Sequence, residues 1–214
     1  MNLSKTTTLL LALTTSFALA GCSDDTGHGG GHGADRDASN IAAAEDFNQA
    51  DVDFATDMIQ HHAQALVMVD LTDGRSLSPE LTTLAEQIRT AQGPEIETMV
   101  GFLNEWDQPI PETMRDHVNG GHGDDDMGVG GMGDMGGDMS GMASSDDLAA
   151  LADAEGEAFE QKWLELMIAH HEGALEMAST EQEDGEYAAA IDLAKAIESA
   201  QQDEIALMED LQDS

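Results

Sequence analysis

Two distant segments of this chain have nearly the same sequence, and this duplication constrains the fold more than any other feature. Residues 54–68 and 163–177 each place a His-His pair between two methionines within an apolar helical pattern. The correspondence continues downstream without a gap, where Ala85, Ile88, Ala91, Gln92, Glu95, Ile96 and Met99 match Ala194, Ile197, Ala200, Gln201, Glu204, Ile205 and Met208. The chain therefore contains a unit of two helices that occurs twice.

The apolar pattern of both copies predicts helices and no strands. In the first copy we expect one helix over residues 50–71 and a second over residues 81–106, with Ser78 as its cap and Pro79 in its first turn. No alternating run of β-branched residues bounded by turns occurs in the sequence. Two hairpins that cover each other's apolar faces predict an all-α fold, a four-helix bundle with pseudo-two-fold symmetry.

The second helix of the first copy contains Gly93 and Pro94. Proline lacks a backbone donor and clashes with the preceding turn, so we expect a kink or a break at Pro94. The second copy has Gln202 and Asp203 at the matching positions, and its second helix is expected to be straighter.

Composition divides the chain into five segments. The segments before and between the two copies are rich in Gly, Asp, His and Met, and they lack the apolar residues that a packed core requires. The expected boundaries are 1–21 for a lipoprotein signal peptide, 22–45 for a flexible tether, 46–111 for the first helical hairpin, 112–145 for a disordered Met/Gly/Asp-rich linker, and 146–214 for the second hairpin.

The N-terminal segment is similar to a bacterial lipoprotein signal. Lys5 supplies a positive charge, and the apolar run of residues 9–20 leads to Leu-Ala-Gly before Cys22, which resembles a lipobox. Cys22 is the only cysteine, so an intramolecular disulfide is impossible, and the resemblance implies acylation of its thiol. We therefore predict an extracytoplasmic protein, in the periplasm or at the cell surface, that is lipid-anchored at Cys22. A plain secretory signal with a chance cysteine is the alternative.

The chain is strongly acidic, with 44 Asp and Glu against 7 Lys and Arg and a formal net charge of −37. Binding of nucleic acid requires clusters of Lys and Arg, so this composition excludes nucleic acid as a partner. The same charge opposes contact with an anionic membrane surface, which leaves the lipid anchor as the only expected membrane contact.

Both histidine pairs face the interior of the predicted bundle. At about 100° per residue, His62 lies near the middle of the apolar stripe and His61 lies on its flank. The second copy repeats this pattern, with His171 central and His170 on the flank. The residues expected on the opposite, solvent-facing side are Asp57, Gln60 and Gln64. The inner stripe expected on the partner helix consists of Gln92, Ile96, Met99 and Leu103, with Glu95 on its border.

Four inward imidazoles need partners, because an unpaired buried polar group costs about 1–3 kcal/mol. Their neighbours in the pattern are mainly Ala, Met, Leu and Ile, which offer little hydrogen bonding, whereas a bound metal would satisfy the ring nitrogens. Thioether sulfur together with imidazole favours copper, and Cu(I) over hard cations. Structural zinc sites more often use Cys and His, so zinc is a weaker match.

The other histidines and several methionines lie in the Gly-rich segments or beside them. A methionine in a polar, flexible segment has no core to fill, so packing does not explain these residues. The predicted auxiliary metal ligands are His28, His32, His117, His122, Met127, Met132, Met135, Met139 and Met142.

Each copy combines His-His-x-x-Ala-x-x-Met, preceded by Met-Ile, with Gln-x-x-Glu-Ile-x-x-Met on the second helix. This double motif resembles the bacterial family known as domain of unknown function 305. The resemblance implies a ferritin-like four-helix bundle, secreted or lipid-anchored, with copper-binding members linked to copper tolerance. The metal-ligand candidates that it implies are Met58, His61, His62, Met68, Met99, Met167, His170, His171, Met177 and Met208.

Three functions remain open at this stage. The first is a copper-binding protein without enzymatic activity that sequesters copper or hands it to a transfer partner. The second is a ferritin-like di-iron oxidase, which needs Glu-x-x-His pairs. Met58, Ile59, Met167 and Ile168 occupy the positions three residues before the histidines, which disfavours that chemistry. The third is a structural or interaction bundle whose core histidines are simply hydrogen-bonded.

Overall fold

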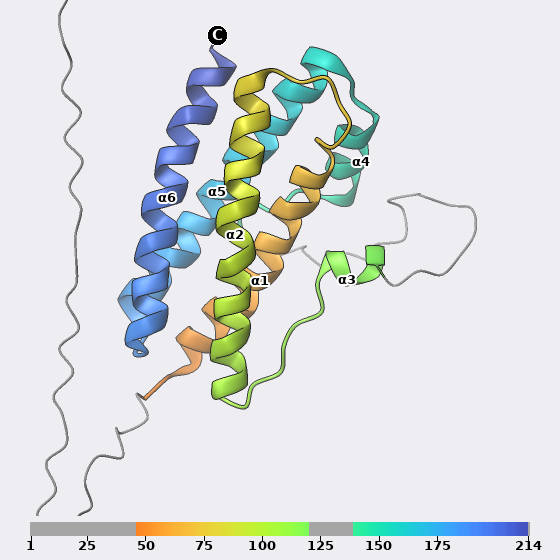
Figure 1. The fold of residues 1–214 in the computed structure, drawn as a ribbon. Coiled ribbons are helices and arrows are strands. Elements are labelled where there is room, and N and C mark those ends of the chain that lie inside the picture. Colours follow the sequence, from red (N-terminus) through yellow and green to blue (C-terminus); the bar gives the residue numbers. More distant parts are fainter. Residues whose placement is uncertain (1–45, 120–138, 214) are drawn as a thin grey trace, which may run out of the picture. The chain divides into compact units, whose positions relative to one another are not determined.

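The computed structural model describes residues 46–119 and 139–213, and these form a bundle of helices (Figure 1). The four long helices are α1 (Gln49–Asp70), α2 (Pro79–Glu105), α5 (Gly156–Asp184) and α6 (Ala188–Gln212). Two short helices, α3 (Met114–Asn119) and α4 (Ser145–Asp153), lie between them in the sequence. Every regular element in the described part of the chain is a helix, which confirms the predicted all-α fold.

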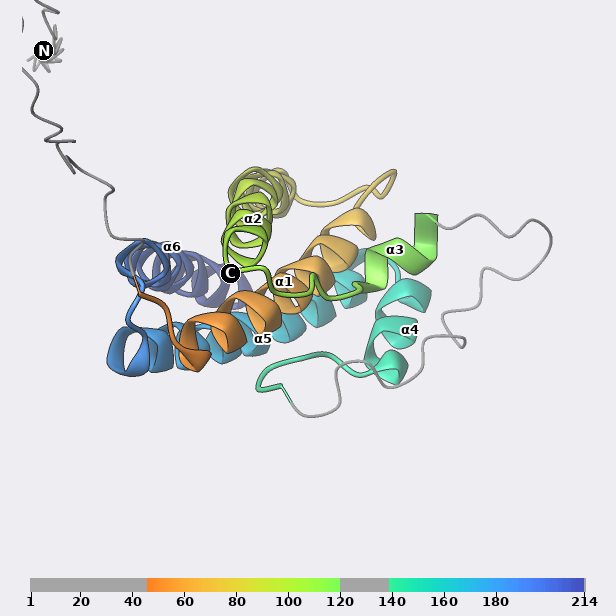
Figure 2. The ribbon, with the colours of Figure 1, turned by 90° about the horizontal axis from the view of Figure 1, so that it is seen from below.

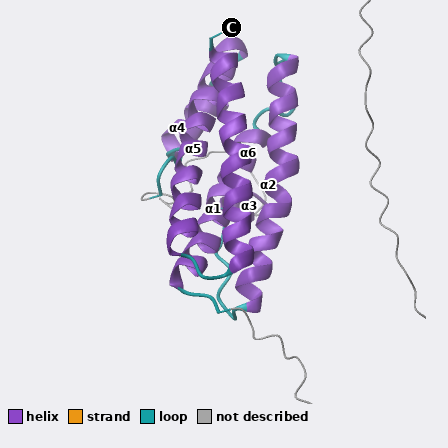
Figure 3. Cartoon of the chain, turned by 90° about the vertical axis from the view of Figure 1, so that its left-hand side faces the viewer, coloured by secondary structure: helices purple, strands orange, loops and turns teal. Residues whose placement is uncertain are grey.

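The long helices form two hairpins, α1–α2 and α5–α6, that pack on each other mainly through α1 and α5. Viewed along the bundle, α1 and α5 lie side by side, with α2 and α6 next to each other (Figure 2). The short helix α3 packs on α1, and α4 packs on α5. Coloured by secondary structure, the described residues show helices joined by loops (Figure 3). Among the described helices, none combines the length and the hydropathy that a membrane span requires.

The predicted start of the second helix is confirmed. The Ser78 hydroxyl accepts a hydrogen bond from the Leu81 backbone N–H at 3.4 Å, and Pro79 is the first residue of α2. A proline is well tolerated there because the first N–H groups of a helix have no intrahelical acceptor.

Each repeat also caps a helix of the other repeat. In α1, the buried Asp51 carboxylate accepts hydrogen bonds from the backbone N–H of Glu186 and Tyr187, directly before α6. In α5, the Glu160 carboxylate accepts hydrogen bonds from the Ser78 N–H and hydroxyl, directly before α2. Carboxylates stabilise helix N-termini, so these two contacts fix the register between the hairpins.

Of the kink or break expected at Pro94, the break is contradicted, because α2 continues through this residue from Pro79 to Glu105. Pro94 and Thr90, whose carbonyl would have received the missing hydrogen bond, are both exposed to solvent. Water can satisfy that carbonyl, while the buried residues Ile88 and Met99 hold the helix against the core on either side.

The linker prediction is wrong at both ends of the segment. Residues 114–119 form α3, and residues 139–144 pack against the bundle before α4 begins. Ser144 caps α4 in a capping box with Asp147, a local signal that the Gly-rich composition conceals. The middle of the predicted linker, the predicted signal peptide and the predicted tether lie outside the described residues.

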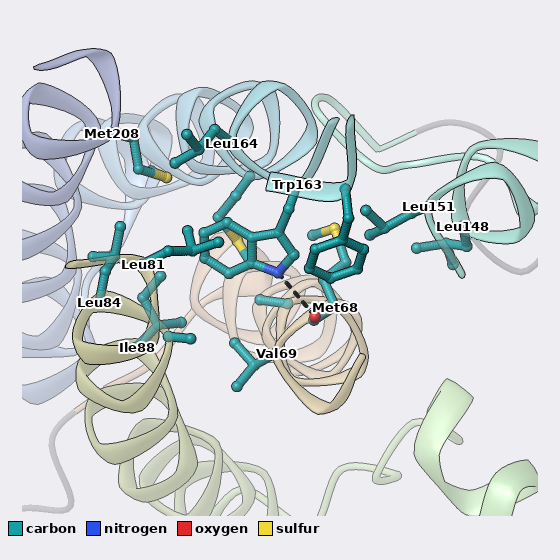
Figure 4. Close-up of a cluster of buried hydrophobic side chains, with 14 residues drawn as sticks. Met68, Val69, Leu81, Leu84, Ile88, Leu148, Leu151, Trp163, Leu164 and Met208 are labelled. Atoms are coloured by element: carbon teal, nitrogen blue, oxygen red, sulfur yellow. Dashed lines mark hydrogen bonds between the residues drawn. The ribbon is translucent and has the colours of Figure 1, made fainter. Parts of the chain in front are cut away.

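The core consists of two apolar clusters at opposite ends of the bundle. Cluster one surrounds Trp163, whose indole N–H donates to the Met68 carbonyl at 2.9 Å (Figure 4). Its buried members are Ala65, Met68, Val69, Leu81, Leu84, Ala85, Ile88, Leu148, Leu151, Phe159, Trp163, Leu164, Met167 and Met208. Cluster two contains Phe54, Ala55, Met58, Ile59, Met99, Leu103, Trp106, Ala174, Ala178, Tyr187, Ala190, Ala194 and Ile197.

Candidate metal centre

A layer of polar side chains separates the two apolar clusters. Along each long helix, the residues on one side of this layer belong to cluster one and those on the other side to cluster two. Each helix contributes two residues, so that the layer consists of His61, His62, Gln92, Glu95, His170, His171, Gln201 and Glu204. We call these eight residues the central polar layer. The four histidines have no solvent exposure, and Gln92 and Gln201 are 2% and 3% exposed.

The two repeats meet within this layer. His61 on α1 and His170 on α5 have ring centroids 3.7 Å apart, with an angle of 37° between the ring planes. The rings of His170 and His171 are 6.3 Å apart. Because one ring of each repeat lies against the other, the histidine pairs belong to a single shared centre at the interface of α1 and α5.

The remaining histidine of each pair contacts a carboxylate of its own hairpin. The Nε2 atom of His62 lies 2.8 Å from Oε2 of Glu95, and the Nε2 atom of His171 lies 2.8 Å from Oε2 of Glu204. The two glutamate side chains are 19% and 16% exposed, so the carboxylates lie at the rim of the layer. The prediction that the histidines lack hydrogen-bonding neighbours is therefore wrong for these two rings.

His61 has a different partner, which comes from the segment before α4. Its Nε2 atom lies 3.2 Å from the carbonyl oxygen of Ser140. Residues 139–143, which we call the linker turn, form a tight turn in which Gly141 has a φ of +78° and the Met142 N–H donates to the Met139 carbonyl. This left-handed conformation favours glycine.

The linker turn lies directly against both central helices. A Cβ atom on Gly173 would collide with the Ser140 carbonyl, so only glycine lets α5 approach the turn so closely. On α1, the Gln64 amide exchanges two hydrogen bonds with the Ala143 backbone, at 2.9 and 2.7 Å. Gln64 is 1% exposed, which corrects the prediction that it faces solvent. Asp57 and Gln60, the other residues expected on that side, are half-buried.

Burial keeps the two central rings neutral. Desolvation, strengthened by the neighbouring His62, lowers the pKa of His61 to about 3, although the Ser140 carbonyl opposes this change. Desolvation and the nearby His61 place the pKa of His170 well below its ordinary value. A neutral imidazole retains a nitrogen lone pair, which is the form that binds a metal ion.

The layer contains polar atoms that have no hydrogen-bond partner among the described residues. These are Nδ1 of all four histidines, Nε2 of His170, and both amide atoms of Gln92 and of Gln201. Each such buried atom costs about 1–3 kcal/mol. A cation held by the ring nitrogens would remove much of this cost, so the donor set of the layer fits a metal ion.

The predicted methionine ligands are distributed on both sides of the layer. Met58 and Met99 are fully buried in cluster two, and Met177 packs against that cluster while partly buried. Met68, Met167 and Met208 are fully buried in cluster one. Met58 and Met167 lie one helical turn before the histidine pairs, so they adjoin the layer from opposite sides.

The structure places few of the predicted auxiliary ligands. Met139 and Met142 are half-buried in the linker turn, beside the carbonyl that contacts His61. His117 belongs to α3. The others, together with the lipidation candidate Cys22, lie outside the described residues.

Sequence reasoning did not assign Glu95, Glu204, Gln92 and Gln201 to the site. The sequence does contain a signal for these residues, because a Gln and a Glu recur at matching positions on the inner side of the second helix in both copies. Among residues 46–119 and 139–213, no group of three or more His, Cys, Asp or Glu side chains is arranged to hold a metal. A metal centre in this part of the chain would therefore need donors outside this set, such as the methionine thioethers, beside the imidazoles.

Fold and site together define a class: a bundle of four long helices with a buried layer of imidazoles. The chain belongs to the family described as domain of unknown function 305, whose model matches residues 51–212. A comparison with curated protein sequences finds no significant match.

Solved structures of the same family have the same fold. A fragment from Deinococcus radiodurans is 28% identical, with a TM-score of 0.61 over 77% of this chain and 96% of that one. A protein from Streptomyces coelicolor, described as one expected to be secreted, is 30% identical, with a TM-score of 0.61 over 76% of this chain and 91% of that one. CopM in its Cu(II)-bound form is 28% identical, with a TM-score of 0.58 over 76% and 95%. CopM has also been solved with Cu(I) and with silver.

Proposed function

We propose that this protein binds Cu(I) in the central polar layer and sequesters it or hands it over outside the cytoplasm, without enzymatic activity. The observation that carries the proposal is the pair of neutral, fully buried rings of His61 and His170, 3.7 Å apart and with unpartnered nitrogens. The binding of copper and silver by CopM, a relative of similar fold, supports the choice of metal.

The charge of the layer favours a monovalent ion. The two central rings are neutral, and the carboxylates of Glu95 and Glu204 lie at the rim. Burial of a cation costs more as its charge increases, and few negative groups are present to offset a second charge. Imidazole nitrogen and thioether sulfur are also the ligands that Cu(I) prefers.

The location belongs to the same proposal. We expect the protein to lie in the periplasm or at the cell surface, with Cys22 acylated and the lipid as its only membrane contact. The auxiliary histidines and methionines would capture copper or pass it to a transfer protein. Mass spectrometry of the membrane-extracted protein tests the anchor, and a Cys22→Ser variant recovered in soluble form is the expected result.

The metal site is tested by anaerobic titration with Cu(I) against a competing chelator, with Fe(II) and Zn(II) as separate arms. Replacement of His61, His62, His170 and His171 by Ala should remove the tightest sites. The matched control is His117→Ala with His122→Ala, which should leave those sites intact. Circular dichroism must show that both variants remain helical. An unchanged tight stoichiometry in the core variant would contradict the site assignment.

Two other outcomes would replace the proposal. Binding of Fe(II) with consumption of oxygen would support a di-iron oxidase, in which Glu95 and Glu204 would be ligands. A folded wild-type protein that does not bind Cu(I) at micromolar concentration would support a purely structural bundle. The carboxylate and carbonyl contacts of the histidines would then serve only to satisfy buried rings.

A further inference from the structure

The structure assigns Nδ1 as the ring nitrogen that three of the four core histidines offer to a metal. Glu95, Glu204 and the Ser140 carbonyl are the groups that fix this choice, and we infer that they act as positioning residues of the metal centre. The inference rests on the proposed function, because it names the ligating atom within the same site.

The carboxylates fix two of the rings. An ionised carboxylate only accepts hydrogen bonds, so the ring nitrogen that contacts it must carry the proton. The contact of His62 with Glu95 is made through Nε2 at 2.8 Å. His62 therefore has the Nε2–H form, and its Nδ1 is the only nitrogen that can present a lone pair.

The same reasoning applies to the other two contacts. His171 contacts Glu204 through Nε2 at 2.8 Å, at the equivalent place in the second copy. His61 contacts the Ser140 carbonyl through Nε2 at 3.2 Å, and a carbonyl oxygen is also an acceptor only. In all three rings the proton stays on Nε2, and Nδ1 is buried without a partner in the described part of the chain.

His170 is the exception, and it serves as an internal reference. Neither of its ring nitrogens has a hydrogen-bond partner among the described residues. The His61 carbonyl acts on the ring electrostatically, but no hydrogen bond fixes its tautomer, so either nitrogen can face the metal. The layer thus combines three rings of fixed orientation with one ring that can adapt.

A purely structural ion pair does not account for this arrangement. If the carboxylates served only to satisfy the rings, each pair would still leave a buried Nδ1 unpaired, at the full cost of desolvation. A metal-ligating histidine usually donates its other N–H to a carboxylate or carbonyl, which fixes both tautomer and ring orientation. The contacts of His61, His62 and His171 are of this kind.

Nuclear magnetic resonance tests the inference on the metal-free wild-type protein. Long-range ¹H–¹⁵N spectra of histidine-labelled protein distinguish a protonated ring nitrogen from an unprotonated one. We expect the Nε2–H form at positions 61, 62 and 171 and no single tautomer at position 170. Titration with Ag(I), a diamagnetic soft monovalent ion, should shift the Nδ1 resonances of the fixed rings. Predominance of the Nδ1–H form, or a silver-induced shift at Nε2, would overturn the inference.

Variants test the positioning role. Glu95→Ala with Glu204→Ala should release the tautomer of His62 and His171 and weaken Ag(I) binding by about 10- to 100-fold. Glu97→Ala with Glu209→Ala removes equal charge from exposed positions of the same two helices and should change neither property. An equal loss of Ag(I) affinity in both double variants would show an effect of net charge and would contradict the positioning role of the two glutamates. Absence of Ag(I) and Cu(I) binding in the wild type would instead refute the proposed function, while the metal-free spectra still decide the tautomers.

Discussion

The two repeats agree closely in their outer contacts and differ at the centre of the bundle. Each places a histidine 2.8 Å from a glutamate of its own hairpin, and each caps a helix of the other hairpin with a carboxylate. At the centre, His61 contacts the linker turn, whereas His170 has no hydrogen-bond partner among the described residues.

The difference arises from one pair of matching positions. Gln64 in the first copy binds the backbone of Ala143, and the equivalent Gly173 leaves space for the Ser140 carbonyl. A duplicated bundle would have a symmetric centre, and a single segment packed against both central helices makes it asymmetric. The linker turn is therefore part of the site architecture.

The largest expected effect concerns the buried rings at acid pH. In the unfolded chain a histidine of ordinary pKa binds a proton below pH 6.5, whereas folded His61 does so only at about 3. The unfolded state then holds more protons, so the free energy of unfolding decreases as the pH falls from 6.5 towards 3, by up to about 1.4 kcal/mol per pH unit for each ring. Denaturant unfolding at pH 4, 5 and 7 measures this dependence.

Single variants compare the two rings. His61→Leu and His170→Leu should each reduce the acid dependence, because desolvation lowers the pKa of both rings in the folded protein. Burial raises the pKa of Glu181 to about 8, which favours folding as the pH falls from 8 towards 4.5, so each variant must be compared with the wild type at the same pH. Equal acid dependence in the wild type and both variants would contradict the assignment of these groups.

The second effect concerns α2 and α6, which differ at Pro94 and its counterpart Asp203. Pro94 removes one hydrogen bond from the interior of a continuous helix, at an exposed position. Pro94→Ala should raise the free energy of unfolding by up to about 3 kcal/mol. Asp203→Ala, the matched control, should raise it by less than about 0.7 kcal/mol. A Pro94→Ala variant no more stable than the wild type would show that α2 needs the proline for its packing.

The third effect compares the two reciprocal caps. Asp51 is fully buried and accepts from Glu186 and Tyr187, whereas Glu160 is half-buried and accepts from Ser78. Asp51→Ala should therefore cost about 2 kcal/mol, and Glu160→Ala about 1 kcal/mol. Thermal unfolding of both variants measures the difference. A larger loss of stability for Glu160→Ala than for Asp51→Ala would contradict this ranking of the two caps.

Periodicity and local signals were sufficient for the hairpins, the cap at Ser78 and the inward direction of the histidines. These features depend on residues a few positions apart, so a helical wheel can resolve them. The partners of the histidines could not be found in this way. Glu95 lies on the border of its stripe, and its contact with His62 depends on the register between two helices, which packing of the whole core determines.

The burial of Gln64 shows the same limit over a greater distance. Its partner, Ala143, lies 79 residues further along the chain, in a Gly-rich segment whose composition predicted disorder. Single residues with special backbone requirements, such as Gly141, anchor this segment, and average composition does not reveal them. Pro94 is the converse case, where a strong local signal was overridden by packing on both sides of it.

The smallest expected effect on global stability belongs to Gly173, the position at which the repeats diverge. In Gly173→Ala, the new methyl group collides with the Ser140 carbonyl, so the linker turn must move away from α5. Alanine also favours the helix by up to about 1 kcal/mol, which offsets the lost contacts and leaves the free energy of unfolding within about 1 kcal/mol of the wild type. The local change is larger. The Ala143 N–H, which donates to Gln64 at 2.7 Å, should exchange with solvent faster, and His61 should lose its single tautomer as its carbonyl partner departs.

Gly101→Ala provides the control for this variant, because it adds the same methyl group to a long helix at a position with nothing within 4 Å. It should raise stability without any change in the exchange of the Ala143 amide. If Gly173→Ala left that amide equally protected, the turn would not depend on close approach to α5. The asymmetry between His61 and His170 would then have to come from the hydrogen bonds of Gln64 on α1 to the linker turn. In that case Gln64→Ala is the variant that should speed the exchange of the Ala143 amide with solvent.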